Sequence, residues 1–413
     1  MNVKNQSLDQ KSIGQKKLLW ISGVATFGAI LTHIYLLIEH FNLKFGQTTG
    51  SSLCDINELF SCSTIAASRF SEFLGVPMAL WGVLVNGLLL ILISMWPFVE
   101  PDRKSLARRN LLLLSGFTVG TSLVMGSISI FALSKLCPFC IMTYVLSVVI
   151  LTAFWVGSKE QQSPTASKSI FENFHFSDIK PLLIGGVVVF VGGFIIDNQV
   201  RNSYGAKNMD AFVQSQVQEW LSNPELQLNV IDPLVKGSPA DQSIMTITEF
   251  ADYRCIHCKH AAPTLKAFVS SHQNVRLQYQ AWPLDGECNT AIPQTNGASC
   301  LLARVVLCAE QLAGKGWSTQ YYLFEHQEDL MAVSSIQERL PEIANSANLT
   351  EEKIKACIDD LETKKMVEKQ SSVGTALNLR GTPTIYVNNR QLPSGQSLPV
   401  LQEVYKYLSK NKK

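Results

Sequence analysis

The sequence predicts a chain of two parts, in which an all-α transmembrane four-helix bundle with a fifth linking helix precedes a soluble α/β domain. Four long uncharged segments predict the bundle, and a strand leading into Cys-x-x-Cys at a helix start predicts the second part. The charges divide in the same way, because residues 1–200 carry 25 of the 68 charged side chains and the remaining 213 carry 43. A net charge of +2 gives no broad basic field, which excludes nucleic acid as a partner.

The membrane spans are predicted from segments that lack Asp, Glu, Lys and Arg and reach the ~20 residues needed to cross a bilayer core. They are residues 18–38, 76–99, 110–134 and 136–158. Residues 181–196 form a fifth, shorter run, which Lys180 can lengthen by extending its ammonium group to the membrane surface. The first segment is too long for a secretory signal and lacks a small-residue cleavage pattern, so we expect it to remain attached.

Lysine and arginine near the spans predict the orientation, because these residues favour the cytoplasmic side. Before residue 200, one side of the five spans carries eleven and the other carries three. The eleven are Lys4, Lys11, Lys16, Lys17, Arg103, Lys104, Arg108, Arg109, Lys159, Lys168 and Lys180, and the three are Lys44, Arg69 and Lys135. We therefore expect a multi-pass inner (plasma) membrane protein with a cytoplasmic N-terminus and a periplasmic or extracellular soluble domain.

These features divide the chain into four predicted parts. Residues 1–160 form the four-helix transmembrane domain, 161–202 a cytoplasmic linker and the fifth span, 203–234 a connecting segment and 235–413 the soluble domain. All ten cysteines then lie on the extracytoplasmic side, which is oxidising in a bacterial-type cell. We expect them to form disulfides or to carry redox chemistry.

Cys137-Pro-Phe-Cys140, called here the membrane pair, opens the fourth span with Pro138 in the favoured first turn of the helix. The amide groups and dipole of a helix N-terminus stabilise a thiolate, so these sulfurs are predicted to be reactive. Tyr144 lies on the same helix face, where its phenol can donate a hydrogen bond to a carbonyl ligand. The alternative is a structural pair beside a tyrosine of the interfacial aromatic belt.

Cys54 and Cys62, called here the loop pair, bracket a polar segment of the first outer loop, which Ser63 and Ser68 follow. Taken alone, this pair is best explained as a structural disulfide. A second pair on the same membrane face favours a relay, because thiol–disulfide exchange moves electrons only between sulfurs that can touch.

The motifs of residues 15–158 together resemble the vitamin K epoxide reductase family. They are Cys54-Asp55, Ser61-Cys62-Ser63, the segment from Gly75-Val-Pro77 to Trp81-Gly82, and Cys137-x-x-Cys140-x-x-x-Tyr144. The resemblance implies a four-helix bundle around a quinone, either ubiquinone or menaquinone. It implies that the membrane pair reduces the quinone, with Cys140 facing it, while Cys137 exchanges with the loop pair as outer shuttle.

On this resemblance we expect Cys140, Tyr144, Ser63 and Ser68 to bind the quinone. Met78 and Phe70 depart from the family pattern, which favours plain quinone reduction over epoxide reduction.

In the second half, residues 244–250 read as a buried strand, and Cys255-Ile-His-Cys258, called here the soluble pair, follows at a helix start. This arrangement is typical of thioredoxin-like folds, in which the first cysteine gains thiolate character. Thr382-Pro383 before a β-branched run predicts the cis-proline turn beside the redox pair, with an ordinary trans turn as the alternative. A zinc site is the rival, but no second Cys-x-x-Cys or paired histidine module joins His257 and His260, so no metal is predicted.

Residues 235–410 resemble DsbA, a thiol oxidase with a thioredoxin-like fold and a helical insertion. The resemblance rests on the soluble pair, on the Glu249-Phe-Ala-Asp-Tyr253 segment before it, and on the 125 positions from Cys258 to Pro383, whose residues 291–372 are largely helical in pattern. It implies that His257 stabilises the thiolate. The dipeptide departs from the Pro-His of DsbA itself, which leaves the redox potential open.

Cys288, Cys300, Cys308 and Cys357 lack Cys-x-x-Cys spacing and are interpreted as structural. We expect Cys288 to pair with Cys300 and Cys308 with Cys357, which is one of three possible arrangements.

Together the two parts predict a membrane thiol oxidase that makes disulfides in exported proteins with free cysteines. Cys255 exchanges with the substrate and Cys258 resolves, beside Pro383, and the electrons then pass through the loop pair and the membrane pair to the membrane quinone pool in the lipid bilayer. A disulfide reductase that runs this relay in reverse and a non-enzymatic metal-binding module are the alternatives. The quinone, the substrate proteins, the direction and the oligomeric state stay open at this point.

Overall fold

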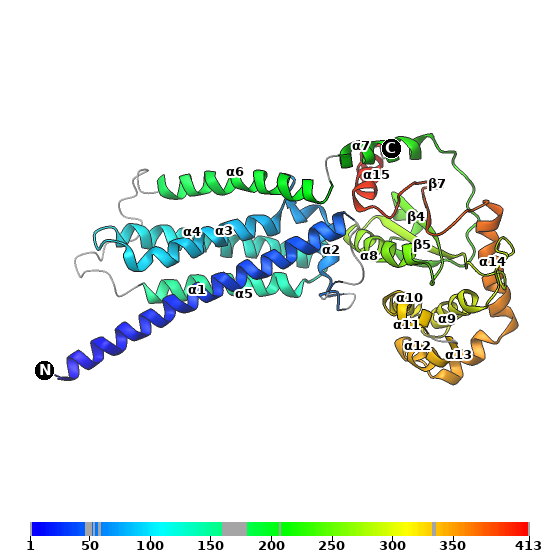
Figure 1. Ribbon diagram of the computed structural model, residues 1–413, viewed down its shortest axis with the longest axis horizontal. Helices are drawn as coiled ribbons and strands as arrows, with labels where there is room; N and C mark the ends of the chain where they lie inside the picture. The colour runs from blue at the N-terminus through cyan, green and yellow to red at the C-terminus, as the bar shows by residue number, and fades with distance from the viewer. Residues whose placement is uncertain are drawn as a thin grey trace. The chain divides into compact units, whose positions relative to one another are not determined.

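The computed structural model describes residues 2–45, 52, 54–56, 59–158, 180–205, 208–332 and 336–411, with the side chains of residues 2–13 and 15 left out. The chain forms two compact units, each described by itself (Figure 1). The first comprises Met1–Phe41 and Leu53–Gly205, and the second Asn42–Ser52 and Ala206–Lys413. Lys159, the predicted linker at 161–179 with Lys168, and the side chains of Lys4 and Lys11 lie outside the described residues.

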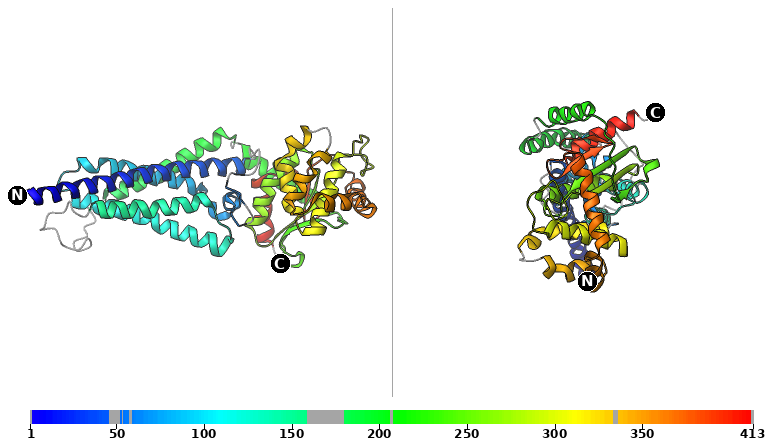
Figure 2. Two further views of the ribbon diagram at one scale, coloured as in Figure 1. Left: turned by 90° about the horizontal axis from the view of Figure 1, so that it is seen from below. Right: turned by 90° about the vertical axis from the view of Figure 1, so that its right-hand side faces the viewer.

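In the described part of the first unit, five helices are long and apolar enough to cross a membrane. They are α1 (Asn2–Lys44), α3 (Met78–Met95), α4 (Lys104–Ser127), α5 (Pro138–Gly157) and α6 (Lys180–Ser203), and they run side by side in Figures 1 and 2. Each overlaps one predicted span. Helix α4 continues as a π-helix over Ile128–Leu133 and ends at Ser134, whose φ of 52° reverses the chain before α5.

The bundle core is apolar, with small residues on α1 that let the neighbouring helices approach closely. Its buried members are Ala25, Ala29, Leu89, Ile93, Trp96, Leu111, Ile150 and Phe154. Large apolar side chains such as Phe131, which is 82% exposed, point outward. A bilayer requires an apolar outer surface on helices of this length. The first unit is therefore the membrane-spanning part of the protein.

Helix α6 packs on the start of α3 through Trp81. The Trp81 ring stacks on Phe190 at 5.7 Å and meets Phe194 edge-on at 5.9 Å between ring centroids. A Cβ on Gly193 would lie 2.5 Å from the indole, so only glycine fits there without a shift. The helix extends beyond the uncharged run because Asp197 pairs with Arg201, which also donates to the Gly75 carbonyl in the hairpin β1 (Glu72–Phe73) and β2 (Val76–Pro77).

The second unit is built on a five-stranded mixed sheet with strand order β3-β5-β4-β6-β7. The central pair, β4 (Met245–Ala251) and β5 (Val275–Ala281), is parallel and is connected by α8 (Ile256–Ser271). The outer strands β3 (Leu234–Gly237), β6 (Thr384–Val387) and β7 (Arg390–Gln391) are antiparallel to their neighbours. This is the predicted thioredoxin-like sheet, with the redox helix leaving the end of its central strand.

A helical insertion separates β5 from β6. It contains α9 (Ala298–Ala313), α10 (Gly316–Glu325), α11 (Gln327–Ala332), α12 (Leu340–Ser346), α13 (Glu351–Ile358) and α14 (Leu361–Ala376). Disulfides Cys288–Cys300 and Cys308–Cys357 brace it, with Cα separations of 5.9 and 6.0 Å, and the predicted pairing is confirmed.

Two further helices pack on this unit. Helix α7 (Met209–Ser222) lies within the predicted connecting segment and packs against α15 (Leu398–Lys410). The Trp220 indole N–H donates to the Val387 carbonyl at 3.1 Å, which fixes α7 to the end of β6.

Candidate active site

Four cysteine sulfurs of the membrane unit lie together at the start of α5. Cys54 is bonded to Cys62 and Cys137 to Cys140, with Cα separations of 5.7 and 5.1 Å. The Cys62 and Cys137 sulfurs, one from each pair, are 3.1 Å apart. Cys54, Cys62 and Cys137 are at most 3% exposed. The loop pair and the membrane pair therefore touch in a buried cluster, as exchange between them requires.

Backbone hydrogen bonds hold the loop pair against the membrane pair. The Ser61 N–H donates to the Leu136 carbonyl at 2.9 Å, and the Leu136 N–H donates to the Leu59 carbonyl at 2.8 Å. Ser61 and Leu136 each precede a cysteine by one position, so their hydrogen bond places Cys62 beside Cys137. Sequence reasoning missed this contact, since backbone pairing carries no signal from residue type.

The short helix α2 (Cys62–Ala67) orients Cys62 and is capped twice at its start. The Ser61 hydroxyl accepts from the Thr64 N–H at 3.2 Å, and the Asp55 carboxylate accepts from the Ser63 N–H at 3.1 Å and from the Ser63 hydroxyl. A carboxylate at a helix N-terminus accepts hydrogen bonds from the free backbone N–H groups and interacts favourably with the helix dipole, so it stabilises the helix. The Cys54-Asp55 and Ser61-Cys62-Ser63 motifs thus build one cap.

Ser63 and Ser68 are buried, and their hydroxyls make local hydrogen bonds. Ser63 donates to Asp55, and Ser68 donates to the Ile65 carbonyl at 2.8 Å. Their predicted contact with a quinone stays a prediction.

Cys137 is the N-cap residue of α5, with Pro138 in the first turn as predicted. Its sulfur accepts from the Cys140 N–H at 3.0 Å. The Phe139 ring lies 4.5 Å from Tyr35 of α1, centroid to centroid, and closes one side of the sulfur cluster. Cys140 and Tyr144 are half-buried, and the Tyr144 ring lies against Gly126 of α4. Cys137 therefore contacts the loop pair, while Cys140 stands one helical turn before the phenol.

The soluble pair lies at the start of α8, with Cys255 as its N-cap residue. The two cysteines are not bonded to each other in this structure, and Cys255 is half-buried whereas Cys258 is fully buried. The Cys255 thiol donates to the Thr382 carbonyl at 3.3 Å, and the Thr382–Pro383 peptide bond is cis, which confirms the predicted turn. A hydrogen bond from the Cys258 thiol and the backbone N–H groups of the helix start lower the pKa of Cys255 to about 6. Cys255 is therefore largely a thiolate at neutral pH, whereas burial raises the pKa of Cys258.

Two buried carboxyl groups lie on the segment that leads to the soluble pair. Burial, with the nearby Cys255 thiolate adding to it, raises the pKa of Glu249 to about 8, and one of its oxygens has no hydrogen-bond partner among the described residues. Asp252 accepts from the Arg254 N–H at 2.5 Å and from the Leu284 N–H at 2.6 Å. Glu249 is therefore mostly protonated at neutral pH, and Asp252 fixes the turn before Cys255.

The helical insertion holds the redox turn through α11. The buried Gln327 side chain donates to the Tyr253 carbonyl at 2.8 Å and to the Cys255 carbonyl at 3.1 Å. The Lys259 ammonium, on the first turn of α8, pairs with Glu328 at 2.9 Å. Neither residue of α11 has a sequence signal, because both lie some 70 positions from their partners. His257, predicted to stabilise the thiolate, is exposed.

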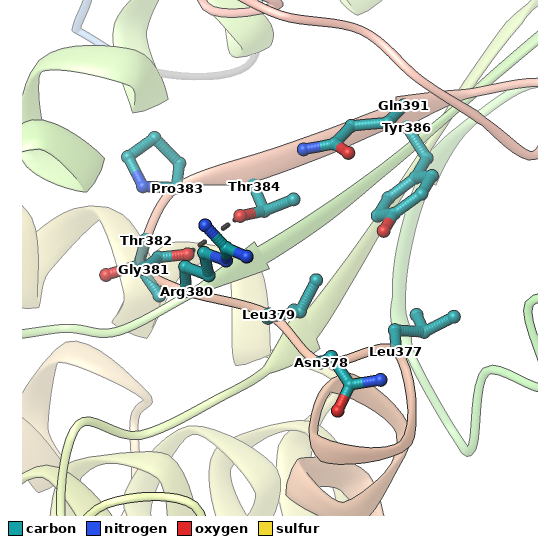
Figure 3. Close-up of a pocket in the computed structure, with 10 residues that line it drawn as sticks. All are labelled: Leu377, Asn378, Leu379, Arg380, Gly381, Thr382, Pro383, Thr384, Tyr386 and Gln391. Atoms are coloured by element: carbon teal, nitrogen blue, oxygen red, sulfur yellow. Dashed lines mark hydrogen bonds between the residues drawn. The ribbon is translucent and has the colours of Figure 1, made fainter. Parts of the chain in front are cut away.

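A cavity of about 390 Å³ borders the cis-proline turn (Figure 3). Residues 377–384 form most of its wall, and Tyr386 and Gln391 complete it. The Thr384 hydroxyl donates to the Gly381 carbonyl at 2.7 Å and shapes the turn. In the described part of the chain, no group of three or more His, Cys, Asp or Glu side chains is placed to hold a metal ion.

Comparison with known proteins yields two family matches. The model of the vitamin K epoxide reductase family matches residues 19–155, and that of the DSBA-like thioredoxin domain matches residues 246–406. Disulfide bond formation protein D of Bacillus subtilis (strain 168) is 26% identical over 166 residues, which cover 38% of this chain and 71% of that protein.

Solved structures similar to this chain include oxidised BdbD from Bacillus subtilis. It is 23% identical, covers 43% of this chain and 94% of its own, and has a TM-score of 0.37. Wolbachia pipientis alpha-DsbA1 is 18% identical, covers 45% of this chain and 95% of its own, and also has a TM-score of 0.37.

Each matched region contains one of the two sulfur sites, the first at the start of α5 and the second at the start of α8. The chain is a thiol–disulfide oxidoreductase of the membrane in which a region of the vitamin K epoxide reductase family is joined to a DsbA-like thioredoxin domain.

Proposed function

We propose that the protein is a membrane thiol oxidase that generates disulfides in exported proteins on the extracytoplasmic side. The observation that carries the proposal is the 3.1 Å contact between the Cys62 and Cys137 sulfurs, because it joins two redox pairs of one unit. The Cys255 thiolate, the buried Cys258 and the cis-proline turn suit a third pair that exchanges with substrate cysteines.

The electrons pass along three pairs in order. A substrate thiolate attacks the Cys255–Cys258 disulfide at the half-buried Cys255, and Cys258 leaves. The low pKa of Cys255 then makes it a good leaving group from the mixed disulfide. A second substrate thiolate releases Cys255 and completes the substrate disulfide. The loop pair then reoxidises the soluble pair and becomes a dithiol. The Cys62 thiolate next attacks the Cys137–Cys140 disulfide at Cys137, and Cys140 leaves as a thiolate.

A quinone at the membrane pair supplies an acceptor of two electrons and two protons that dissolves in the bilayer. The residues present fit such a group, because a half-buried sulfur and a half-buried phenol stand one turn apart on α5 inside an apolar bundle. Cys140 closes the disulfide with Cys137, and the Tyr144 hydroxyl is placed to donate to a carbonyl oxygen.

The test is quinone reduction by the purified full-length protein supplied with a reduced cysteine-containing protein. Wild type should turn over, and Cys140→Ser and Cys255→Ser should each abolish turnover. The control removes the Cys288–Cys300 disulfide by a double change to serine, which is the same chemical change outside the relay and should leave turnover in place. Wild-type protein that oxidises nothing while its relay cysteines are intact would overturn the proposal.

A second experiment tests the direction of the relay. In the proposed direction the soluble pair is mostly oxidised in cells, which trapping with a thiol-specific alkylating reagent would measure. A mostly reduced soluble pair would support a disulfide reductase instead.

A further inference from the structure

Two polar side chains in the core of the membrane unit take no part in the relay described above. His33 of α1 and Asn86 of α3 each have a buried atom, Nδ1 and Oδ1 respectively, without a hydrogen-bond partner among the described residues. Unpaired polar atoms in an apolar membrane interior are costly, and ionisable side chains there usually have a function.

Both side chains lie on core-facing stripes of their helices. His33 is seven residues after Thr26 and seven before His40, both of which are buried, so the three share one side of α1. Asn86 is 3% exposed, and Leu89 and Ile93 follow it on the buried side of α3.

The two side chains meet at Gly82 of α3. A Cβ at Gly82 would lie 2.4 Å from His33 Nδ1, so the imidazole lies directly against the glycine backbone. The Asn86 Nδ2 group donates to the Gly82 carbonyl at 2.8 Å, which leaves its Oδ1 as a hydrogen-bond acceptor. Glycine at position 82 makes this approach of α1 and α3 possible.

Helix contacts place this polar pair at the depth of Cys140 and Tyr144. Helices α1 and α5 touch at Tyr35 with Phe139 and again at Gly28 with Leu146, so seven residues separate the two contacts on each helix and the helices run in opposite directions. The rise per residue is the same on both helices, and His33 is two residues before Tyr35 in the sequence. His33 therefore lies level with the segment between Cys140 and Tyr144.

We propose that His33 and Asn86 form the second polar wall of the quinone headgroup site, and that His33 carries a proton to the quinone. This inference rests on the proposed function. His33 Nδ1, as N–H, is a donor that suits a quinone carbonyl, whereas Asn86 Oδ1 accepts only and suits the hydroxyl of the quinol product. Cys140 and Tyr144 form the first wall.

The step balances without any further reactant. As Cys137 and Cys140 close their disulfide, the dithiol gives up two electrons and two protons, and formation of the quinol consumes both. His33 gives its Nδ1 proton to the quinone and is reprotonated at Nδ1 by one of the two thiol protons, and the Tyr144 hydroxyl gives its proton and is reprotonated by the other. Both side chains return to their starting state after each turnover.

The experiment uses the purified full-length protein and a short-chain ubiquinone, and it measures binding separately from turnover. Binding is followed by quenching of tryptophan fluorescence, and turnover by quinol formation with dithiothreitol as reductant. His33→Gln should leave the Kd nearly unchanged and lower kcat about 100-fold, the effect of losing a proton carrier. Asn86→Leu should raise the Kd of the corresponding quinol about tenfold, the effect of one lost hydrogen bond, and leave the Kd of the quinone nearly unchanged.

Thr26→Val is the matched control, because the Thr26 hydroxyl donates its one proton to the Ser22 carbonyl of its own helix at 2.7 Å and so has none to give to a quinone carbonyl. It should change neither Kd nor kcat. Intact loop and membrane disulfides in each variant, checked by mass spectrometry, show that the bundle is folded. Wild-type kcat in a folded His33→Gln variant would overturn this inference and leave the relay standing, whereas no quinone binding or turnover by wild type would overturn both.

Discussion

The low pKa of Cys255 has a cause that a change of one side chain can test. Donation from the Cys258 thiol is the largest cause of the pKa of about 6, ahead of the backbone N–H groups at the start of α8. Cys258→Ala removes the donor, whereas Cys258→Ser replaces it with a hydroxyl at nearly the same position. The pKa of Cys255 should therefore rise in the alanine variant and stay low in the serine variant.

The size of the rise follows from the strength of one charge-assisted hydrogen bond. Such a bond contributes about 1.5–3 kcal/mol, and 1.36 kcal/mol corresponds to one pH unit, so the midpoint should move from about pH 6 to about pH 7–8. The rate at one pH is a poor measure, because a more basic thiolate is also a better nucleophile, with a Brønsted slope of ~0.4–0.5. The midpoint of a full pH profile separates the two effects.

The assay is alkylation of the reduced full-length protein by iodoacetamide across the acid to alkaline range, with the peptide that contains Cys255 quantified by mass spectrometry. The serine variant should titrate near pH 6 and the alanine variant well above it. Equal midpoints near pH 6 in both variants would refute the reasoning and assign the low pKa to the helix start alone.

Four further predictions concern other residues described above. Because burial raises the pKa of Glu249 from 4.5 to about 8, the folded unit retains a proton that the unfolded chain loses, so stability should fall as the pH rises through this window. Glu249→Gln should flatten that fall, and thermal unfolding at the two ends of the window would show an unchanged slope if the assignment were wrong. Gln327→Leu should lower the free energy of unfolding by about 2 kcal/mol, because the buried Tyr253 carbonyl and the partly buried Cys255 carbonyl lose their donor. Denaturant unfolding measures this change, and a loss near zero would contradict the bracing role. Asp55→Asn should slow disulfide exchange between the loop pair and the membrane pair about threefold to tenfold, because the α2 cap loses its charge; stopped-flow reduction followed by acid trapping measures the rate, and a wild-type rate would show that the cap does not limit exchange. Alkaline phosphatase fused after Lys413 should be active, and a stable but inactive fusion would reverse the proposed orientation.

Features fixed by a few neighbouring residues were predictable from the sequence. The two Cys-x-x-Cys motifs, Pro138 in a first turn and Pro383 in a cis bond depend on local chain chemistry, and the structure has all of them. The spans were predictable because a bilayer demands long uncharged segments. The pairing of Cys308 with Cys357 was chosen among three arrangements, and the structure confirms it.

Contacts between distant segments were not predictable, because they depend on backbone geometry or on single polar side chains. The pairing of Leu59 and Ser61 with Leu136 uses only N–H and C=O groups, which every residue here possesses. Gln327 reaches the soluble pair only because the helical insertion folds back over it. His33 and Asn86 are isolated polar residues in apolar helices, and no single-sequence pattern joins them.

The close fit of α6 against α3 bears on how this chain could be recombined with others. A generic apolar helix of equal length would still tether the soluble unit, yet it would lack the glycine that admits the Trp81 indole and the arginine that reaches the Gly75 carbonyl. A chimera cut before α6 would therefore strip the bundle of a packed neighbour. In a chimera, α6 should therefore be kept together with the membrane unit, and the part that is exchanged should begin after residue 205.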